Sequence, residues 1–223
     1  MWHAMSLKAL IFDFDGLMVE TEQSIFDAYR DIFVEYGVQL PLRVWELIIG
    51  TTGHRDQIFV ALEKMIGCPV DRDMLHERAR ERHHMVSSQL PAVEGLVEQI
   101  ESAQKLGLNL GVASSSTLEW VAGHLGRLGL LRHFGAVCTR GDVVKVKPDP
   151  ELYRLAVARL DVEPSEAIAL EDSPNGITSA KAAGLFCVAI PNPLTTQMEL
   201  GHADMQVSTL SALSLSDIAA RME

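Results

Sequence analysis

Short apolar segments that end abruptly in polar residues recur along this chain, and they constrain its fold more than any other feature. They cover residues 8–14, 108–113, 136–138, 167–170 and 186–190. Each has the length and composition of a buried strand. Amphipathic stretches typical of helices separate the later segments, at residues 95–106, 116–129, 150–160 and 175–183. This alternation predicts an α/β fold with a doubly wound, Rossmann-like parallel sheet of five or six strands and helices on both faces.

The segment from residue 20 to residue 90 interrupts this alternation with helical patterns only. Apolar residues recur at three- and four-residue steps from residue 25 to residue 36, and further helices are expected at 45–49, 55–66 and 72–87. An insert of this size is too large for a simple crossover between strands. We therefore predict a helical cap domain of residues 20–90 on a core of residues 1–19 and 91–223. The helix at 72–87, rich in Arg and His, is predicted to present a solvated face.

The charge balance argues against several classes of partner. Thirty acidic and 19 basic residues give a formal net charge of −11 at pH 7, which repels nucleic acid and anionic lipid. We see neither an apolar run long enough to span a bilayer nor a signal-peptide core. Three widely spaced cysteines without a CxxC pair indicate buried, reduced thiols. We therefore expect a cytoplasmic protein without nucleic-acid or membrane partners, and we take a monomer as the working assumption.

Polar side chains gather where the predicted strands end. Asp13 and Asp15 end the first strand, Ser114, Ser115 and Ser116 end the second, Lys147 lies in the loop after the third, and Glu171 and Asp172 end the fourth. Ligands of an open parallel sheet bind beyond the carboxyl ends of its strands. We therefore expect these side chains to meet at one edge of the sheet.

Such a set favours phosphate chemistry supported by a magnesium ion. Clustered carboxylates repel one another unless a cation bridges them, and oxygen ligands suit Mg²⁺. A serine hydroxyl and a lysine ammonium can hold phosphoryl oxygens. A second carboxylate beside a nucleophilic one can protonate the leaving alcohol and later deprotonate water. Among the serines, Ser116 has the spacing of a capping box with Glu119, which predicts Ser116 as the N-cap of the next helix.

Four segments at these strand ends resemble the four motifs of the haloacid dehalogenase-like (HAD) hydrolase superfamily. They are residues 10–16, 112–114, 147–150 and 170–176. Their order and strand placement agree over roughly residues 7–193, and the insert resembles the helical cap of the subclass that includes sugar-phosphate phosphatases and β-phosphoglucomutases. The resemblance implies a Mg²⁺-dependent phosphatase that hydrolyses a small phosphate monoester, such as a sugar phosphate, a polyol phosphate or phosphoglycolate, through an aspartyl-phosphate intermediate.

The resemblance also implies a role for each acidic residue of the rim. Asp13 is expected to be the nucleophile and a metal ligand. Asp15 is expected to be the general acid/base, with its backbone carbonyl on the metal. Asp172 is expected to bind the metal directly, with Glu171 either beside it or in its outer shell.

Ser114 and Lys147 are expected to bind the phosphoryl group, and Ser115 is a candidate for a second phosphate contact. Lys145 competes with Lys147, but a proline follows Lys147 as in the family's third motif and restrains its loop. In the predicted cap, His54 and Arg55 follow a loop where relatives keep substrate-selecting residues, so both are candidate substrate contacts.

Two rival functions stay open. β-Phosphoglucomutase relatives carry a histidine shortly after the first motif, and the matching position here is Ile25, which cannot transfer protons. This lowers the case for a mutase without removing it. A phosphoacceptor signalling module also combines acidic residues, a Ser or Thr and a Lys on a doubly wound sheet. Such a module needs no cap, so the insert favours an enzyme.

Overall fold

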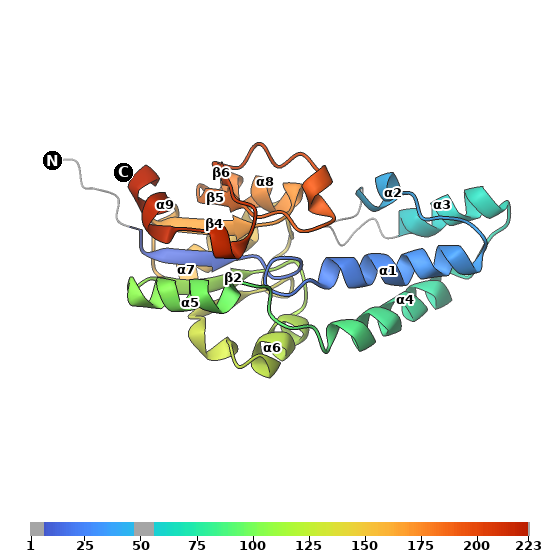
Figure 1. The fold of residues 1–223 in the computed structure, drawn as a ribbon, viewed down its shortest axis with the longest axis horizontal. Helices are drawn as coiled ribbons and strands as arrows, with labels where there is room; N and C mark the ends of the chain where they lie inside the picture. The colour runs from blue at the N-terminus through green and yellow to red at the C-terminus, as the bar shows by residue number, and fades with distance from the viewer. Residues whose placement is uncertain (1–6, 47–55, 223) are drawn as a thin grey trace.

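The computed structural model describes residues 7–46 and 56–222, and these residues confirm the predicted α/β fold. The strands are β1 (Ala9–Phe12), β2 (Asn109–Ala113), β3 (Ala136–Cys138), β4 (Ala167–Glu171), β5 (Phe186–Ala189) and β6 (Met205–Gln206). The helices are α1 (Thr21–Glu35), α2 (Leu42–Glu46), α3 (Asp56–Ile66), α4 (Arg72–Ser87), α5 (Leu96–Lys105), α6 (Leu118–Arg127), α7 (Glu151–Arg159), α8 (Pro174–Ala183) and α9 (Leu215–Met222). The sheet lies at one end of the molecule, and α1 to α4 extend from it at the other (Figure 1).

The strands of the described residues form one parallel sheet in the order β3-β2-β1-β4-β5-β6. β1 pairs on both sides, with Leu10 opposite Leu110 of β2 and opposite Ile168 of β4. The chain therefore winds outward from β1 in both directions, as the doubly wound prediction requires. The short edge strand β6 was not among the five predicted segments, because its two residues are partly exposed and carry no apolar run.

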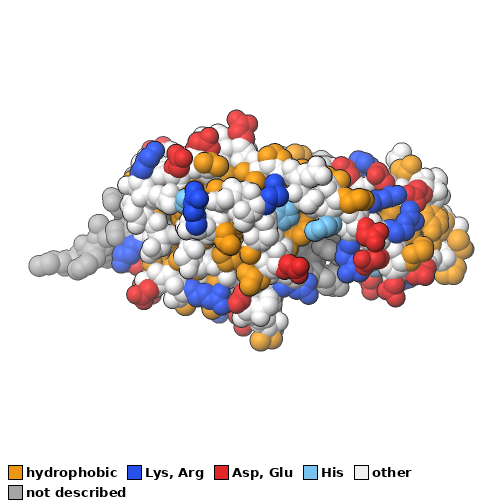
Figure 2. Space-filling model, turned by 90° about the horizontal axis from the view of Figure 1, so that it is seen from below, with side chains coloured by type: hydrophobic (Ala, Val, Ile, Leu, Met, Phe, Trp, Pro, Cys, Tyr) orange, Lys and Arg blue, Asp and Glu red, His pale blue; other side chains and the backbone are white. Residues whose placement is uncertain are grey.

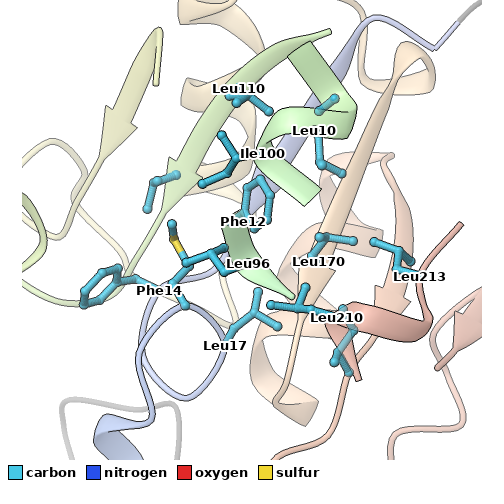
Figure 3. Close-up of a cluster of buried hydrophobic side chains, with 14 of the residues drawn as sticks. Leu10, Phe12, Phe14, Leu17, Leu96, Ile100, Leu110, Leu170, Leu210 and Leu213 are labelled. Atoms are coloured by element: carbon cyan, nitrogen blue, oxygen red, sulfur yellow. The ribbon is translucent and has the colours of Figure 1, made fainter. Parts of the chain in front are cut away.

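The two faces of the sheet are buried under different helices. Leu10 and Phe12 pack with residues of α5, α6 and α9 in one core cluster, part of which Figure 3 shows around Leu96 and Ile100. The alternate residue Ile11 packs with residues of α7 and α8 on the opposite face. All four residues of β1 are fully buried. This two-sided burial explains why the strand reads as a continuous apolar run.

Helices α1 to α4 pack around an apolar cluster of their own. Tyr29 and Phe33 of α1 meet Phe59 of α3 and Leu75 of α4 in this cluster, and Leu194, which follows β5, joins it from the core side. Helices α1 and α4 lie side by side along their length (Figure 1). The boundaries of the cap at residues 20 and 90 remain a prediction.

The start of α6 differs from the prediction. Thr117, and not Ser116, is the N-cap: its backbone is extended and its hydroxyl accepts from the backbone N–H of Trp120 at 3.3 Å. The capping-box pattern was misleading because Ser116 uses its hydroxyl elsewhere, on Asp15. The helix therefore begins one residue later than the capping pattern predicts.

Two of the three cysteines are buried. None of the three cysteines, all within the described residues, is in a disulfide; Cys138 and Cys187 are buried as predicted, whereas Cys68 is exposed. Burial raises the pKa of the Cys138 thiol to about 11, so this thiol stays protonated.

Within residues 7–46 and 56–222, no helix combines the length and the apolar character needed to cross a bilayer.

Candidate active site

The carboxyl ends of β1, β3 and β4 bring three predicted residues into direct contact. The Lys147 ammonium lies 2.6 Å from Asp13 Oδ1 and 2.6 Å from Glu171 Oε1. The backbone N–H of Asp13 donates to the carbonyl of Leu170 at 2.9 Å, which extends the β1–β4 pairing to the start of the site. Lys147 thus joins two acids that are distant along the chain, while Lys145 is exposed and pairs with Asp149 at 4.0 Å.

Glu171 is held in a fully buried position. Its Oε1 also accepts from the Tyr153 hydroxyl at 2.6 Å, and its Oε2 accepts from the Ser173 hydroxyl at 3.3 Å. Gly176 leaves the space for this carboxylate, since a Cβ on Gly176 would lie 1.8 Å from Glu171 Oε2. The glycine of the fourth motif is therefore required by the close approach of a buried acid to the first turn of α8.

Asp172 completes an acidic cluster with Asp13 and Glu171, in which one oxygen of each lies within 4.8 Å of the others. Asn192, in the turn after β5, donates to Asp172 Oδ2 at 2.6 Å. Gly16 is needed here as well: its φ is +82°, and a Cβ would lie 2.2 Å from Asp172 Oδ2. Both motif glycines thus make room for acids of the cluster.

The cluster carries more negative than positive charge. Three carboxylates and one ammonium leave a formal charge of −2 on Asp13, Glu171, Asp172 and Lys147. Burial, with repulsion from Glu171, raises the pKa of Asp13 to about 7, and burial with repulsion from Asp13 raises the pKa of Asp172. Burial opposes the charge of Lys147, but its two acidic partners outweigh that effect and raise its pKa. A divalent cation fits this all-oxygen cluster in ligand type and in charge.

The three serines after β2 have different surroundings. Ser114 is fully buried, and its hydroxyl accepts from the backbone N–H of Ser116 at 3.0 Å. Ser115 and Ser116 line the cavity described below, whereas Ser114 does not reach its surface. The hydroxyl oxygen of Ser115 is buried and has no hydrogen-bond partner among the described residues. An unpaired hydroxyl at a cavity wall is suited to binding a ligand.

Asp15 is held by donors from several elements. Its Oδ1 accepts from the Thr21 hydroxyl at 2.7 Å and from the Trp120 indole N–H at 2.8 Å. Its Oδ2 accepts from the Ser116 hydroxyl at 2.5 Å. The carboxylate therefore has a defined orientation beside the acidic cluster.

A cavity of about 630 Å³ opens over these groups. Asp13, Asp15, Lys147 and Asp172 form part of its wall, and helix α4 supplies another part through the residues Glu77, Arg80, Glu81, His83 and His84. Arg80 and His84 are exposed, as the predicted solvated face of α4 requires, whereas His83 is only half-buried, and all three also line the cavity. Acidic and basic side chains are interspersed over the end of the molecule that α1 to α4 form, and histidine side chains lie between this end and the sheet (Figure 2). The candidates His54 and Arg55 lie outside the described residues.

Several neighbours of the site were missed from the sequence. Tyr153 and Trp120 lie on predicted helices, where an aromatic residue is most often a packing residue. Asn192 lies between two prolines, a pattern that signals only a turn. Thr21 was assigned to the start of the cap. The sequence did not indicate which residues these four side chains contact. Their hydrogen bonds to Asp15, Glu171 and Asp172 join residues that are far apart in the chain or lie in different elements.

Comparisons with known proteins point in the same direction. The family profile described as haloacid dehalogenase-like hydrolase matches residues 10–190. The protein named "Putative phosphatase YhcW" of Bacillus subtilis (strain 168) is 41% identical over 211 residues, covering 94% of this chain and 95% of that protein. Validoxylamine A 7'-phosphate phosphatase of Streptomyces hygroscopicus subsp. limoneus is 31% identical over 207 residues, covering 92% and 94%. The crystal structure of CbbY from Rhodobacter sphaeroides in complex with phosphate has 29% identity and a TM-score of 0.73, covering 94% and 98%.

Proposed function

Because the chain belongs to the haloacid dehalogenase-like hydrolase family, we propose that it hydrolyses a small sugar or polyol phosphate through a covalent phosphate ester on Asp13. The family and the names of its relatives make the chain an enzyme of the phosphatase type. The observation that carries the finer proposal is the convergence of Asp13, Lys147 and Asp172 at the floor of one cavity, with Asp15 beside them.

The proposed reaction has two steps. In the first, a carboxylate oxygen of Asp13 attacks phosphorus while the bond from phosphorus to the leaving oxygen breaks, and the Asp15 carboxylic acid gives its proton to that oxygen. In the second, the Asp15 carboxylate takes a proton from water. The water oxygen then attacks phosphorus, the bond to Asp13 breaks, and inorganic phosphate leaves with Asp13 regenerated.

The buried charges prepare Asp13 for attack. Lys147 pairs with Asp13 and restrains one of its oxygens, while Ser115 has a free hydroxyl for a phosphoryl oxygen. Asp13, Asp172 and the backbone carbonyl of Asp15 would hold Mg²⁺. When bound, the ion would offset the negative charge of the cluster and of the phosphoryl group. We assign Glu171 an outer position, because its oxygens already accept from Lys147, Tyr153 and Ser173.

The size and lining of the cavity support a small hydroxylated substrate. A volume of about 630 Å³ falls in the range of small-molecule sites. Charged side chains such as Glu77, Arg80 and Arg140 can bind hydroxyls, and Trp45 and Ile25 offer apolar surface. The Streptomyces relative is named as a phosphatase of validoxylamine A 7'-phosphate, which agrees with a small phosphate ester here without identifying it.

The mutase alternative requires a group that transfers protons near the reacting sugar. Ile25 occupies the predicted position and lines the cavity, and its side chain cannot act in this way. We therefore favour transfer to water. Formation of glucose 6-phosphate from β-glucose 1-phosphate, followed with a coupled dehydrogenase, would reverse this preference if it exceeded phosphate release.

The test is release of inorganic phosphate from a panel of hexose, hexitol and pentose phosphates and phosphoglycolate, with Mg²⁺ and after EDTA. We expect turnover with Mg²⁺, reversible loss with EDTA, and almost no turnover by Asp13→Asn despite normal folding. Acid quenching followed by mass spectrometry should detect phosphate on the wild-type protein and none on Asp13→Asn. Activity that survives chelation would refute the metal role, and full activity of Asp13→Asn would refute the nucleophile.

A further inference from the structure

Trp120 connects the proposed general acid to the surface between the cap and the core. It lies in the first turn of α6, its indole N–H donates to Asp15 Oδ1 at 2.8 Å, and it lines the cavity. The backbone N–H of Trp120 binds the N-cap Thr117, so the main chain at this position is anchored by the start of the helix. The first turn of helix α6, rather than a loop, therefore holds the indole N–H at hydrogen-bond distance from Asp15.

The ring of Trp120 packs against histidines from both sides of the junction. The ring of His83, on α4, is 5.0 Å from it at 32°, and the ring of His84 is 6.2 Å away. On the core side, His124 of α6 lies 4.5 Å away at 67°. His83 is itself positioned by a 2.8 Å hydrogen bond between its Nδ1 and the Ser24 hydroxyl of α1. The indole therefore fills the contact between α6 and α4, and α1 holds His83 in place beside it.

Two of the donors to Asp15 depend on the position of the cap helices. Thr21 is the first residue of α1, and Trp120 is packed against α4. Ser116 and Trp120 both bind Asp15 from the core, and Trp120 also packs against α4. A carboxylate can rotate about its Cβ–Cγ bond, so removing one donor from Oδ1 widens the range of orientations that Asp15 adopts.

We propose that Trp120 is a positioning residue that orients Asp15 for proton transfer, and that it does so only when α4 is docked against α6. This inference rests on the proposed function, since it assigns a support to its general acid. Proton transfer requires a donor aligned with the leaving oxygen. Trp120→Phe keeps an aromatic ring against His83 and His124 and removes the N–H donor.

The test compares two leaving groups through kcat/KM, which covers only the steps up to departure of the leaving group. A sugar or polyol phosphate leaves as an alkoxide and needs the proton from Asp15. p-Nitrophenyl phosphate leaves as a stabilised phenolate and needs little help. For Trp120→Phe we expect kcat/KM to fall about tenfold or more on the alkyl ester and less than threefold on the aryl ester. Glu119→Gln, an exposed change in the same helical turn, should alter neither value.

Two further variants separate positioning from a general loss of structure. His83→Ala should give the same preference for the aryl ester, because it loosens the packing of the indole. In the double variant Asp15→Asn/Trp120→Phe, the second change should have almost no further effect, since its route through Asp15 is already lost.

Thermal unfolding of each variant serves to show that it is folded. An equal loss on both esters, no loss on either, or independent effects of the two changes in the double variant would overturn the role of Trp120 while leaving the proposed function intact. If the wild-type protein released no phosphate from any ester, the proposed function and this inference would both fail.

Discussion

Replacing Asp13 by asparagine should stabilise the protein when no divalent cation is present. Asp13 is only 7% exposed, and burial together with the charge of Glu171 raises its pKa from 3.8 to about 7. Asparagine has nearly the same size and no charge, so it removes the cost of ionising this buried group. Lys147 keeps its ion pair with Glu171 in the variant. We therefore expect Asp13, the proposed nucleophile, to lower the stability of the metal-free fold.

The magnitude follows from the pKa difference. Because the pKa of Asp13 is higher in the folded state than in the unfolded state, its ionisation costs the wild-type protein no stability below about pH 4. The free energy of unfolding of the wild type then falls, relative to that of Asp13→Asn, as the pH rises from about 4 toward 7. A difference of about three pH units corresponds to about 4 kcal/mol, since each unit is about 1.4 kcal/mol. We expect Asp13→Asn to gain up to about 4 kcal/mol at pH 8, and about 1–2 kcal/mol at pH 5, where ionisation in the folded state is largely avoided.

The assay is urea unfolding, followed by tryptophan fluorescence, of EDTA-treated wild-type and variant proteins at pH 8 and pH 5. Asp73→Asn, at an exposed position in the first turn of α4, is the matched control for removing one negative charge. Adding Mg²⁺ should raise the stability of the wild-type protein more than that of Asp13→Asn. A variant that is less stable than the wild type at pH 8, or a gain that is the same at both pH values, would refute the reasoning.

Three further outcomes follow from the packing of the site. Tyr153→Phe removes the 2.6 Å hydrogen bond to Glu171 and should cost about 1–3 kcal/mol of unfolding free energy in urea, because a buried carboxylate loses a partner; an unchanged midpoint would contradict this. Gly176→Ala should destabilise by about 1–3 kcal/mol or more, since its Cβ would overlap Glu171. Gly123→Ala, in an open helical position, should be neutral or stabilising in the same urea measurement, and equal losses in the two variants would refute the steric argument. Mg²⁺ should raise the thermal midpoint of the wild-type protein as its concentration increases, and a midpoint insensitive to Mg²⁺ would count against the cation site.

The sequence by itself determined the architecture and most of the acidic cluster. Apolar segments that alternate with amphipathic ones require a parallel sheet, and parallel strands carry their carboxyl ends to one edge. Asp13, Lys147 and Asp172 follow three different predicted strands, so their placement at one edge of the sheet was predictable from the sequence. The contact of Lys147 with Asp13 depends in addition on the path of the loop that follows β3.

Only the tertiary structure decided how the remaining side chains are used. Ser116 has a capping pattern, but its hydroxyl binds Asp15, 101 positions away in the chain. Trp120 and Asn192 carry no local signal of their contacts with Asp15 and Asp172. Whether two side chains form a hydrogen bond depends on differences of a few tenths of an ångström in the distance between donor and acceptor. The packing of helices and loops on the sheet sets these distances. Periodicity and residue type record which face of an element is buried, and they contain no information about these distances.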